Sequence, residues 1–226
     1  MFDRLSERHP WVPYVVPLVA FMVMLGIGPA LPVPPRVEAI VRVTVLMAVI
    51  WVVARPVLTF RLTQPLGTIG VGVLVFVLWI LPDLLVPGYR ASSLFQNALT
   101  GTVKSSMSVE ARADSLVVAL RFVRAAVIVP IVEELFWRGW LPRWLERTGS
   151  FWTVPLGEFS RYAFWATAIL FAMEHGPFWD VGLVGGLIYN WWMRRTKSLA
   201  DLIWCHAITN ACLSVWVVAL GDWRYW

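Results

Sequence analysis

The chain has 226 residues, of which 59% are apolar and only 15% are charged. A soluble domain of this length carries considerably more charge, so the composition excludes an ordinary soluble globular protein and indicates a protein embedded in a lipid bilayer. The net charge of +5 does not indicate a nucleic-acid partner, because the sequence has no basic run with interleaved aromatic residues and most of its Lys and Arg residues lie between apolar segments.

Seven apolar stretches follow one another along the chain, and we expect each to form a transmembrane helix. A spanning helix needs about 20 mainly apolar residues. The stretches are 11–33, 37–54, 65–82, 116–142, 160–175, 178–193 and 199–220. The longest polar connection, residues 83–115, separates the third stretch from the fourth. The predicted fold is all-α, a polytopic membrane helix bundle of about seven transmembrane helices.

We interpret the whole chain, residues 1–226, as a single integral membrane domain. Residues 1–115 hold the N-terminal helices and the polar loop and carry no motif that we can match, whereas residues 116–220 hold the helices with the candidate catalytic residues.

The Lys and Arg residues predict how the chain is oriented, because cytoplasmic loops carry an excess of them. With seven spans and a cytoplasmic N-terminus, ten of the 19 lie on the cytoplasmic side: Arg4, Arg8, Arg55, Arg61, Arg143, Arg147, Arg161, Arg194, Arg195 and Lys197. Six lie outside: Arg36, Arg42, Arg90, Lys104, Arg112 and Arg224. The cytoplasmic loops are then expected at 55–64, 143–160 and 194–198. Arg121 and Arg124 fall inside the fourth stretch, and we expect them to extend to the outer interface rather than to contact a substrate.

The fourth stretch contains two adjacent carboxylates at membrane depth, Glu133 and Glu134, followed by Arg138. Ionisable residues inside a span are costly and are therefore candidates for function. Glu134 and Arg138 are four residues apart and can pair on one helix face, whereas Glu133 points about 100° away. Such a pair could be purely structural, but it leaves Glu133 available as a general base.

Two histidines and an asparagine lie in later apolar stretches. His175 ends the fifth stretch, and His206 and Asn210 share a helix face in the seventh. A helix rise of 1.5 Å per residue places Glu133, His206 and His175 roughly 15, 14 and 21 Å from the cytoplasmic boundary. The three side chains can therefore meet in one layer of the bundle, although each histidine alone is equally compatible with a simple interhelical contact.

These residues form three motifs that, taken in order, resemble the CPBP family. That family comprises the CAAX prenyl endoproteases and their Abi-type, bacteriocin-processing relatives. The motifs are Glu-Glu-x-x-x-Arg (Glu133, Glu134, Arg138), Phe-x-x-x-His (Phe171, His175) and His-x-x-x-Asn (His206, Asn210). Each motif alone is common, whereas all three in this order, each in a predicted span, are fairly specific. The resemblance covers about residues 116–220.

The resemblance implies an intramembrane glutamic endopeptidase that needs no cofactor. It implies that Glu133 and His175 activate a water molecule, that His206 and Asn210 hold the oxyanion, and that Glu134 and Arg138 complete the first motif. The implied partners are a membrane-associated or lipidated peptide or protein substrate and the lipid bilayer, and the implied location is a bacterial inner membrane. These residue types supply both an activated water and oxyanion donors without a serine or cysteine nucleophile.

Two other functions remain open on the sequence alone. Glu133, His175 and His206 could ligate zinc in a membrane hydrolase and leave one position free, although no His-Glu-x-x-His pattern supports this. The chain could also be a transporter or a binding and immunity protein, because transporters use buried Glu and His as proton relays. The inverted repeats or paired broken helices that are typical of many transporters are not visible.

Overall fold

The computed structural model describes residues 8–30 and 32–226. Arg4, one of the residues counted on the cytoplasmic side above, lies outside these residues. Within the described residues the chain forms helices and loops without a β-strand, and only an isolated antiparallel bridge joins Asn97 to Gly101. The prediction of an all-α fold is confirmed for this part of the chain.

A helix occupies each of the seven predicted apolar stretches. The elements are α2 (Val12–Ile27), α3 (Pro35–Val49), α4 (Pro65–Leu85), α5 (Val109–Ala113), α6 (Ser115–Val123), α7 (Val129–Glu134), α8 (Leu141–Glu146), α9 (Arg161–Glu174), α10 (Trp179–Thr196) and α11 (Leu199–Leu220). Four helical segments are long and apolar enough to cross a membrane: Pro35–Val57, Pro65–Leu85, Ser115–Glu146 and Leu199–Leu220. The helices α2, α9 and α10 are shorter or more polar, so the count of seven spans stays a prediction.

Two of the long helices, Pro35–Val57 and Ser115–Glu146, contain widened π-helical turns, each of which ends two residues before a proline. The turns are Ile50–Ala54 before Pro56, Arg124–Ile128 before Pro130 and Leu135–Trp140 before Pro142. A proline inside a helix removes one backbone donor and clashes with the carbonyl four residues earlier, so the preceding turn has to widen or kink. Two of these turns flank Glu133 and Glu134, which therefore lie in a short regular segment between two distortions.

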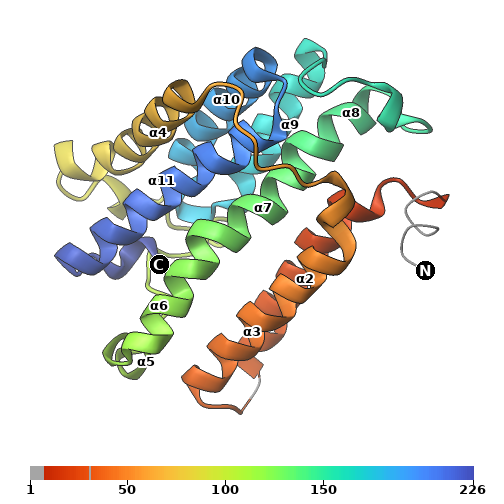
Figure 1. The fold of residues 1–226 in the computed structure, drawn as a ribbon. Coiled ribbons are helices and arrows are strands. Elements are labelled where there is room, and N and C mark those ends of the chain that lie inside the picture. Colours follow the sequence, from red (N-terminus) through yellow and green to blue (C-terminus); the bar gives the residue numbers. More distant parts are fainter. Residues whose placement is uncertain (1–7, 31) are drawn as a thin grey trace.

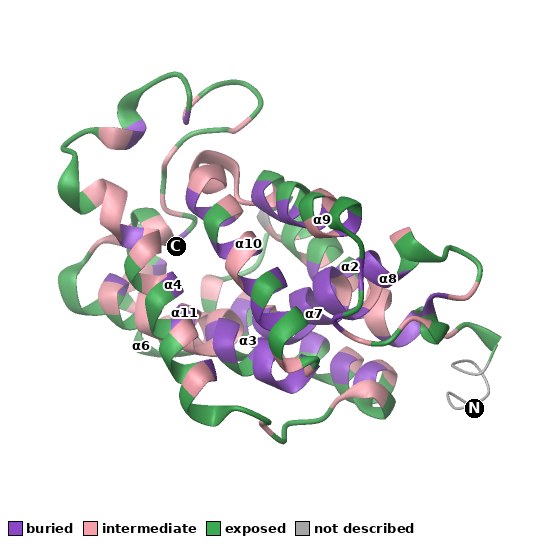
Figure 2. Cartoon of the chain, turned by 90° about the horizontal axis from the view of Figure 1, so that it is seen from above, coloured by how far each residue is buried: buried purple, intermediate pink, exposed green. Residues whose placement is uncertain are grey.

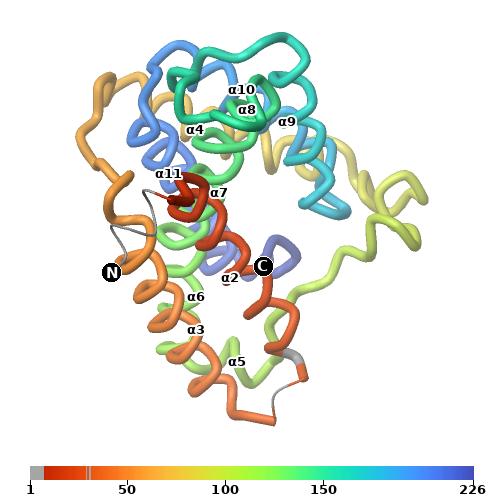
Figure 3. Tube along the Cα trace, turned by 90° about the vertical axis from the view of Figure 1, so that its right-hand side faces the viewer, coloured from red at the N-terminus to blue at the C-terminus, as the bar shows by residue number. Residues whose placement is uncertain are grey.

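The long helix Ser115–Glu146, formed by α6, α7 and α8, runs diagonally through the molecule (Figure 1). It packs against α11 on one side and against α2 and α3 on the other, while α4 and α10 pack beyond α11 and α9 packs against α10. Figure 3 shows residues 86–108 leaving the bundle to one side before the chain reaches α5. The helix that carries Glu133 and Glu134 is thus enclosed by other helices.

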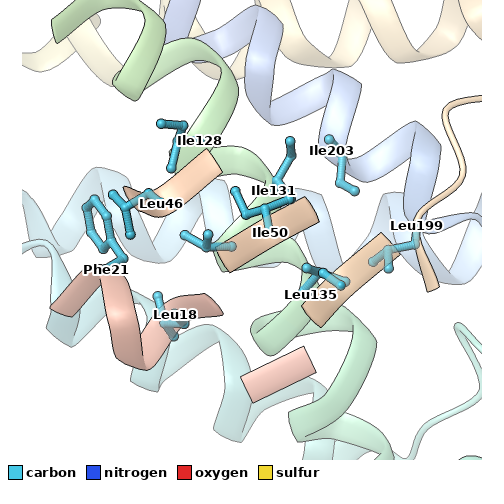
Figure 4. Packing of buried hydrophobic residues seen from close by; sticks show 11 residues of the cluster. Leu18, Phe21, Leu46, Ile50, Ile128, Ile131, Leu135, Leu199 and Ile203 are labelled. Carbon is cyan, nitrogen blue, oxygen red and sulfur yellow. The ribbon is translucent and has the colours of Figure 1, made fainter. Parts of the chain in front are cut away.

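A buried apolar cluster holds the N-terminal helices against the long helix and α11. Figure 4 shows its members pointing toward one another: Leu18, Phe21, Leu46, Ile50, Ile128, Ile131, Leu135, Leu199 and Ile203. In Figure 2, buried residues gather along α7 and on the helix faces around it. Burial of such side chains contributes about 1.5–3 kcal/mol each relative to water, although part of this packing takes place between helices already in lipid.

Two features fix α4 against α11. Gly72 lies so close to α11 that a Cβ atom at this position would be 2.6 Å from the backbone oxygen of Cys205. Asp201, in the first turn of α11, accepts hydrogen bonds of 2.7–2.9 Å from two backbone N–H groups and two hydroxyls of residues 63–68. The carboxylate thereby satisfies donors at the start of α4 that have no partner within that helix.

The outer surface of the bundle is strongly apolar. The exposed fraction is 84% for Leu66, 66% for Trp51 and 57% for Val215, and many other large apolar side chains are exposed on the same helices. Contiguous apolar surface of this extent is unfavourable in water and is suited to contact with lipid chains. Together with the four long apolar helices, it identifies an integral membrane protein.

Candidate active site

The structure brings four of the six predicted site residues to one cavity. Glu133, His175, His206 and Asn210 line a space of about 490 Å³ within the bundle. They come from α7, from the residue that ends α9, and from α11. Glu133 is only 6% exposed, and its Oε2 atom has no hydrogen-bond partner in the described part of the protein.

Glu134 and Arg138 do not line this cavity and lie behind it. Arg138 Nη1 donates to Glu134 Oε1 at 3.0 Å, so the ion pair expected from the four-residue spacing is present. The same Glu134 oxygen is 2.8 Å from His206 Nδ1. Because Glu134 and Arg138 are 0% and 1% exposed, their pairing is the main compensation for two charges removed from water. Glu134 consequently holds His206 in place, and Glu133 is free of that pair.

Arg138 is held by further contacts that the sequence motifs do not reveal. Its Nε donates to Asn190 Oδ1 at 3.2 Å, and its guanidinium stacks over the rings of Phe171 and Tyr189 at 4.3 and 5.2 Å from their centroids. The Asn190 amide nitrogen in turn donates to the Thr167 hydroxyl at 2.9 Å. The planar guanidinium therefore joins α7, α9 and α10, a geometry that lysine cannot reproduce.

The hydrogen bonds of the two histidines indicate which ring nitrogen carries a proton. His175 Nδ1 lies 2.7 Å from the carbonyl oxygen of Phe171, which can only accept, so Nδ1 donates and the neutral ring keeps a free lone pair on Nε2. His206 Nδ1 likewise faces the Glu134 carboxylate, which leaves its Nε2 for the cavity that the ring lines. His175 can accept a proton from the cavity, and His206 can donate to it when Nε2 is also protonated.

Asn210 uses one of its two amide hydrogens within the protein. Its Nδ2 donates to the backbone oxygen of Ala125 at 2.9 Å. Ala125 belongs to the widened turn Arg124–Ile128, and such turns leave a carbonyl without its normal partner in the helix. The second hydrogen on Nδ2 is available to a ligand in the cavity.

Among the described residues, no group of three His, Cys, Asp or Glu side chains is arranged to hold a metal ion. The set Glu133, His175 and His206 that the sequence offered for zinc is brought to one cavity but not to that geometry.

One comparison with known proteins gives a family. Residues 115–212 match the family model described as type II CAAX prenyl endopeptidase Rce1-like. Residues 115–212 belong to the CAAX prenyl endopeptidase family. The resemblance to the CPBP and CAAX proteases is thereby confirmed, and this family is a family of proteases. Searches of curated proteins and of solved structures gave no match.

The matched CAAX endopeptidase region contains every predicted site residue and also Glu174, which the sequence motifs do not single out. Glu174 lines the same cavity and accepts a hydrogen bond of 2.8 Å from the indole nitrogen of Trp137. Its position next to His175 was the available signal, but only the packing of α9 on α8 and α10 shows that it faces the cavity. The cavity thus holds two carboxylates, Glu133 and Glu174.

Close packing of glycines on α10 positions His175. The sequence contains Gly182, Gly185 and Gly186 in this helix, and small residues permit helices to approach closely. A Cβ atom at Gly182 would lie 3.2 Å from three atoms of the His175 side chain, whereas one at Gly185 would lie 3.5 Å from Val75, an ordinary contact. Gly182 therefore limits where the His175 ring can lie.

We expect Gly182→Ala to lower kcat of the endopeptidase by about tenfold, because a shift of a catalytic group by a fraction of an ångström misaligns it. Gly185→Ala is the matched control on the same helix and should retain wild-type turnover. The measurement is the peptide-cleavage rate of both variants at matched thermal stability. Equal loss of activity in the two variants would show that the effect is general packing and not the position of His175.

Proposed function

We propose that this protein is an intramembrane endopeptidase in which Glu133 activates water to hydrolyse a peptide bond. The observation that carries the proposal is that the two adjacent carboxylates have different surroundings. Glu134 is paired with Arg138, whereas Glu133 faces the cavity without an ion pair to any described residue. A carboxylate that is already in an ion pair is a poor base, whereas a free one next to a histidine can take a proton from water.

The proposed reaction gives each of the four predicted residues that line the cavity a distinct role. Glu133 accepts a proton from the water, assisted by the lone pair on His175 Nε2, while the water oxygen attacks the scissile carbonyl carbon. The carbonyl oxygen becomes an oxyanion, to which His206 Nε2–H and the free N–H of Asn210 donate. The proton held by Glu133 then passes to the leaving amine, the C–N bond breaks, and Glu133 is regenerated.

Glu134 and Arg138 act through His206 in this proposal. A proton on Nε2 in addition to Nδ1 makes the His206 ring cationic, and the Glu134 carboxylate at 2.8 Å balances that charge. Arg138 fixes the carboxylate so that it does not rotate toward the cavity. These two residues are therefore positioning residues.

Asn210→Ala is expected to lower kcat by about 100-fold with a smaller change in KM, because an oxyanion donor acts in the transition state rather than in the bound substrate. Cys212→Ala, on the same helix but outside the cavity lining, is the control and should cleave at the wild-type rate. The measurement is the kcat and KM of both variants and of the wild type on one peptide. An Asn210→Ala effect confined to KM would contradict the oxyanion assignment.

A metal-free preparation separates this reaction from a zinc hydrolase. We expect full activity after chelation, because the proposed reaction uses a carboxylate and two imidazoles and no ion. Loss of activity on chelation, with recovery on stoichiometric zinc alone, would favour Glu133, His175 and His206 as ligands.

The substrate and the location follow from the same proposal. A site enclosed by helices of a membrane protein takes a membrane-associated or lipidated peptide or protein segment, and a cleaved product found by mass spectrometry after incubation with membrane peptides tests this. We propose a bacterial inner membrane with the N-terminus in the cytoplasm, as the Lys and Arg distribution indicates. Labelling of a cysteine introduced at residue 196 from the outer side alone would reverse this orientation.

A further inference from the structure

A second, basic cavity adjoins the candidate active site. It measures about 320 Å³ and lies between α3, α6 and the segment 106–111. Three arginines line it, Arg42 from α3 and Arg121 and Arg124 from the long helix, together with a single carboxylate, Glu38. The cavity therefore carries an excess of positive charge.

The arginines of this cavity lack enough protein partners. Arg42 pairs with Glu38 and is only 7% exposed. Arg121 and Arg124 have no ion pair or hydrogen bond to any described residue, and Arg121 only stacks on Trp226 at 5.6 Å. The Nε atoms of all three arginines are buried without a partner. Arg121 and Arg124, which the sequence predicted to extend to the outer interface, both line this cavity.

Unpaired guanidinium groups in such surroundings call for an anion. The remaining lining is largely apolar, including Leu25, Val43 and Leu120. In a medium of low dielectric constant an unpaired charge is costly, and its attraction for an opposite charge is correspondingly strong. Guanidinium binds carboxylate and phosphate through paired N–H donors.

The basic cavity shares part of its lining with the candidate active site. Leu25, Ser106 and Arg121 line both spaces. Arg124 and Arg121 precede Glu133 by nine and twelve residues in one helix, which corresponds to roughly 14 and 18 Å at 1.5 Å per residue. An extended peptide advances about 3.4 Å per residue, so about four or five residues of peptide span this distance.

We propose that Arg42, Arg121 and Arg124 bind a carboxylate of the peptide substrate about four or five residues from the scissile bond. The carboxylate belongs either to the C-terminus of the peptide or to an acidic side chain at the same distance. The inference rests on the proposed function, because it takes the neighbouring cavity as the place of cleavage. The lining shared with that cavity favours a peptide group over a lipid headgroup.

A binding experiment tests this without requiring turnover. The probes are fluorescein-labelled Ala-Val-Ile-Ala-Leu with a free C-terminal carboxylate, the same peptide with a C-terminal amide, and the amide with Glu in place of Leu. Binding to the Glu133→Gln protein in phosphatidylcholine nanodiscs is followed by anisotropy. We expect the free acid to bind about tenfold tighter than the amide, and the Glu peptide to recover this affinity if a side chain can supply the carboxylate.

Single substitutions then test which arginines are responsible for the difference between acid and amide affinity. Arg124→Gln and Arg121→Gln should each reduce the ratio of acid to amide affinity to about one or two, and they should not lower thermal stability because neither residue has a charged partner. Arg36→Gln is the matched control: Arg36 lies on α3 near Arg42, pairs with Asp114 at 2.8 Å and lines neither cavity. It should keep the full ratio.

Two results would overturn the proposal. Equal affinity of acid and amide for the Glu133→Gln protein would show that no carboxylate is recognised, whether or not the wild-type protein is a protease. A gain in thermal stability from phosphatidylglycerol that Arg124→Gln abolishes, with no discrimination between the peptides, would assign the arginines to a lipid phosphate. Failure of the wild-type protein to cleave any peptide concerns the proposed function alone.

Discussion

Glu133→Gln is expected to lower kcat/KM by about 10³-fold or more while the protein stays folded. Glutamine keeps the size of the side chain but cannot accept the proton of an attacking water, and removal of a general base costs about 10²–10⁴-fold. Glu133 makes no ion pair with any residue that the structure describes, and its Oε2 has no hydrogen-bond partner among them. The substitution therefore removes no attractive pairing, and the thermal transition should stay at or above that of the wild type.

The measurement combines the cleavage rate of one peptide with the melting temperature in the same detergent. Glu110→Gln is the matched control, since Glu110 is exposed on the short helix α5 and lies outside the cavity. Cleavage by Glu133→Gln at the wild-type rate would remove Glu133 as the base and leave Glu174, the second carboxylate of the cavity, as the alternative.

Arg138→Met is expected to have the largest effect on stability. It removes the ion pair to Glu134 and the hydrogen bond to Asn190, and it leaves the Glu134 carboxylate charged at a site with no exposure. Breaking a buried pair by removing one partner costs about 3–5 kcal/mol. For a chain of this size that corresponds to a melting temperature lower by roughly 10 °C.

A double variant distinguishes the loss of the pair from the loss of packing. Glu134→Gln combined with Arg138→Met leaves no unpaired charge, so it should be more stable than Arg138→Met alone. Activity should remain low in the double variant, because His206 has lost the carboxylate that holds it. If the double variant is as unstable as the sum of the two single variants, the contacts of the guanidinium with Phe171 and Tyr189 carry the stability instead.

Local patterns in the sequence account for much of the fold and of the candidate site. The apolar stretches predict the helices, because a helix in lipid satisfies its own backbone hydrogen bonds and needs only enough apolar length. The Glu134–Arg138 pair follows from a spacing of four residues within one helix, and it forms even though Leu135–Trp140 is a widened turn. The widened turns were not part of the prediction, which treated residues 116–142 as one uninterrupted apolar stretch. Pro130 and Pro142 were the signals in the sequence that could have indicated them.

Contacts between distant segments could not be predicted in the same way. Asn210 donates to Ala125 across 85 residues of sequence, and Asn190 donates to Phe164 across 26. Each depends on which faces of two helices meet and at what height, and apolar composition does not specify either for helices surrounded by lipid. Glu174 shows the same difficulty. The motif identified the adjacent His175, but nothing in the sequence indicated that the Glu174 side chain faces the cavity.

The sequence by itself determined the all-α membrane character of this protein, the protease family that residues 115–212 match and the identity of the polar residues in and behind the candidate active site. These properties depend on composition, on spacing within single helices and on the order of three motifs along the chain. Only the tertiary structure decided that Glu134 and not Glu133 contacts His206, that His175 Nδ1 is occupied by the Phe171 carbonyl, and that the arginines of α3 and α6–α7 face a common cavity. The physical reason is that the packing of helices on one another decides where each side chain points and what it contacts. Close contacts at glycines and widened turns before prolines shift the helices relative to one another by ångströms.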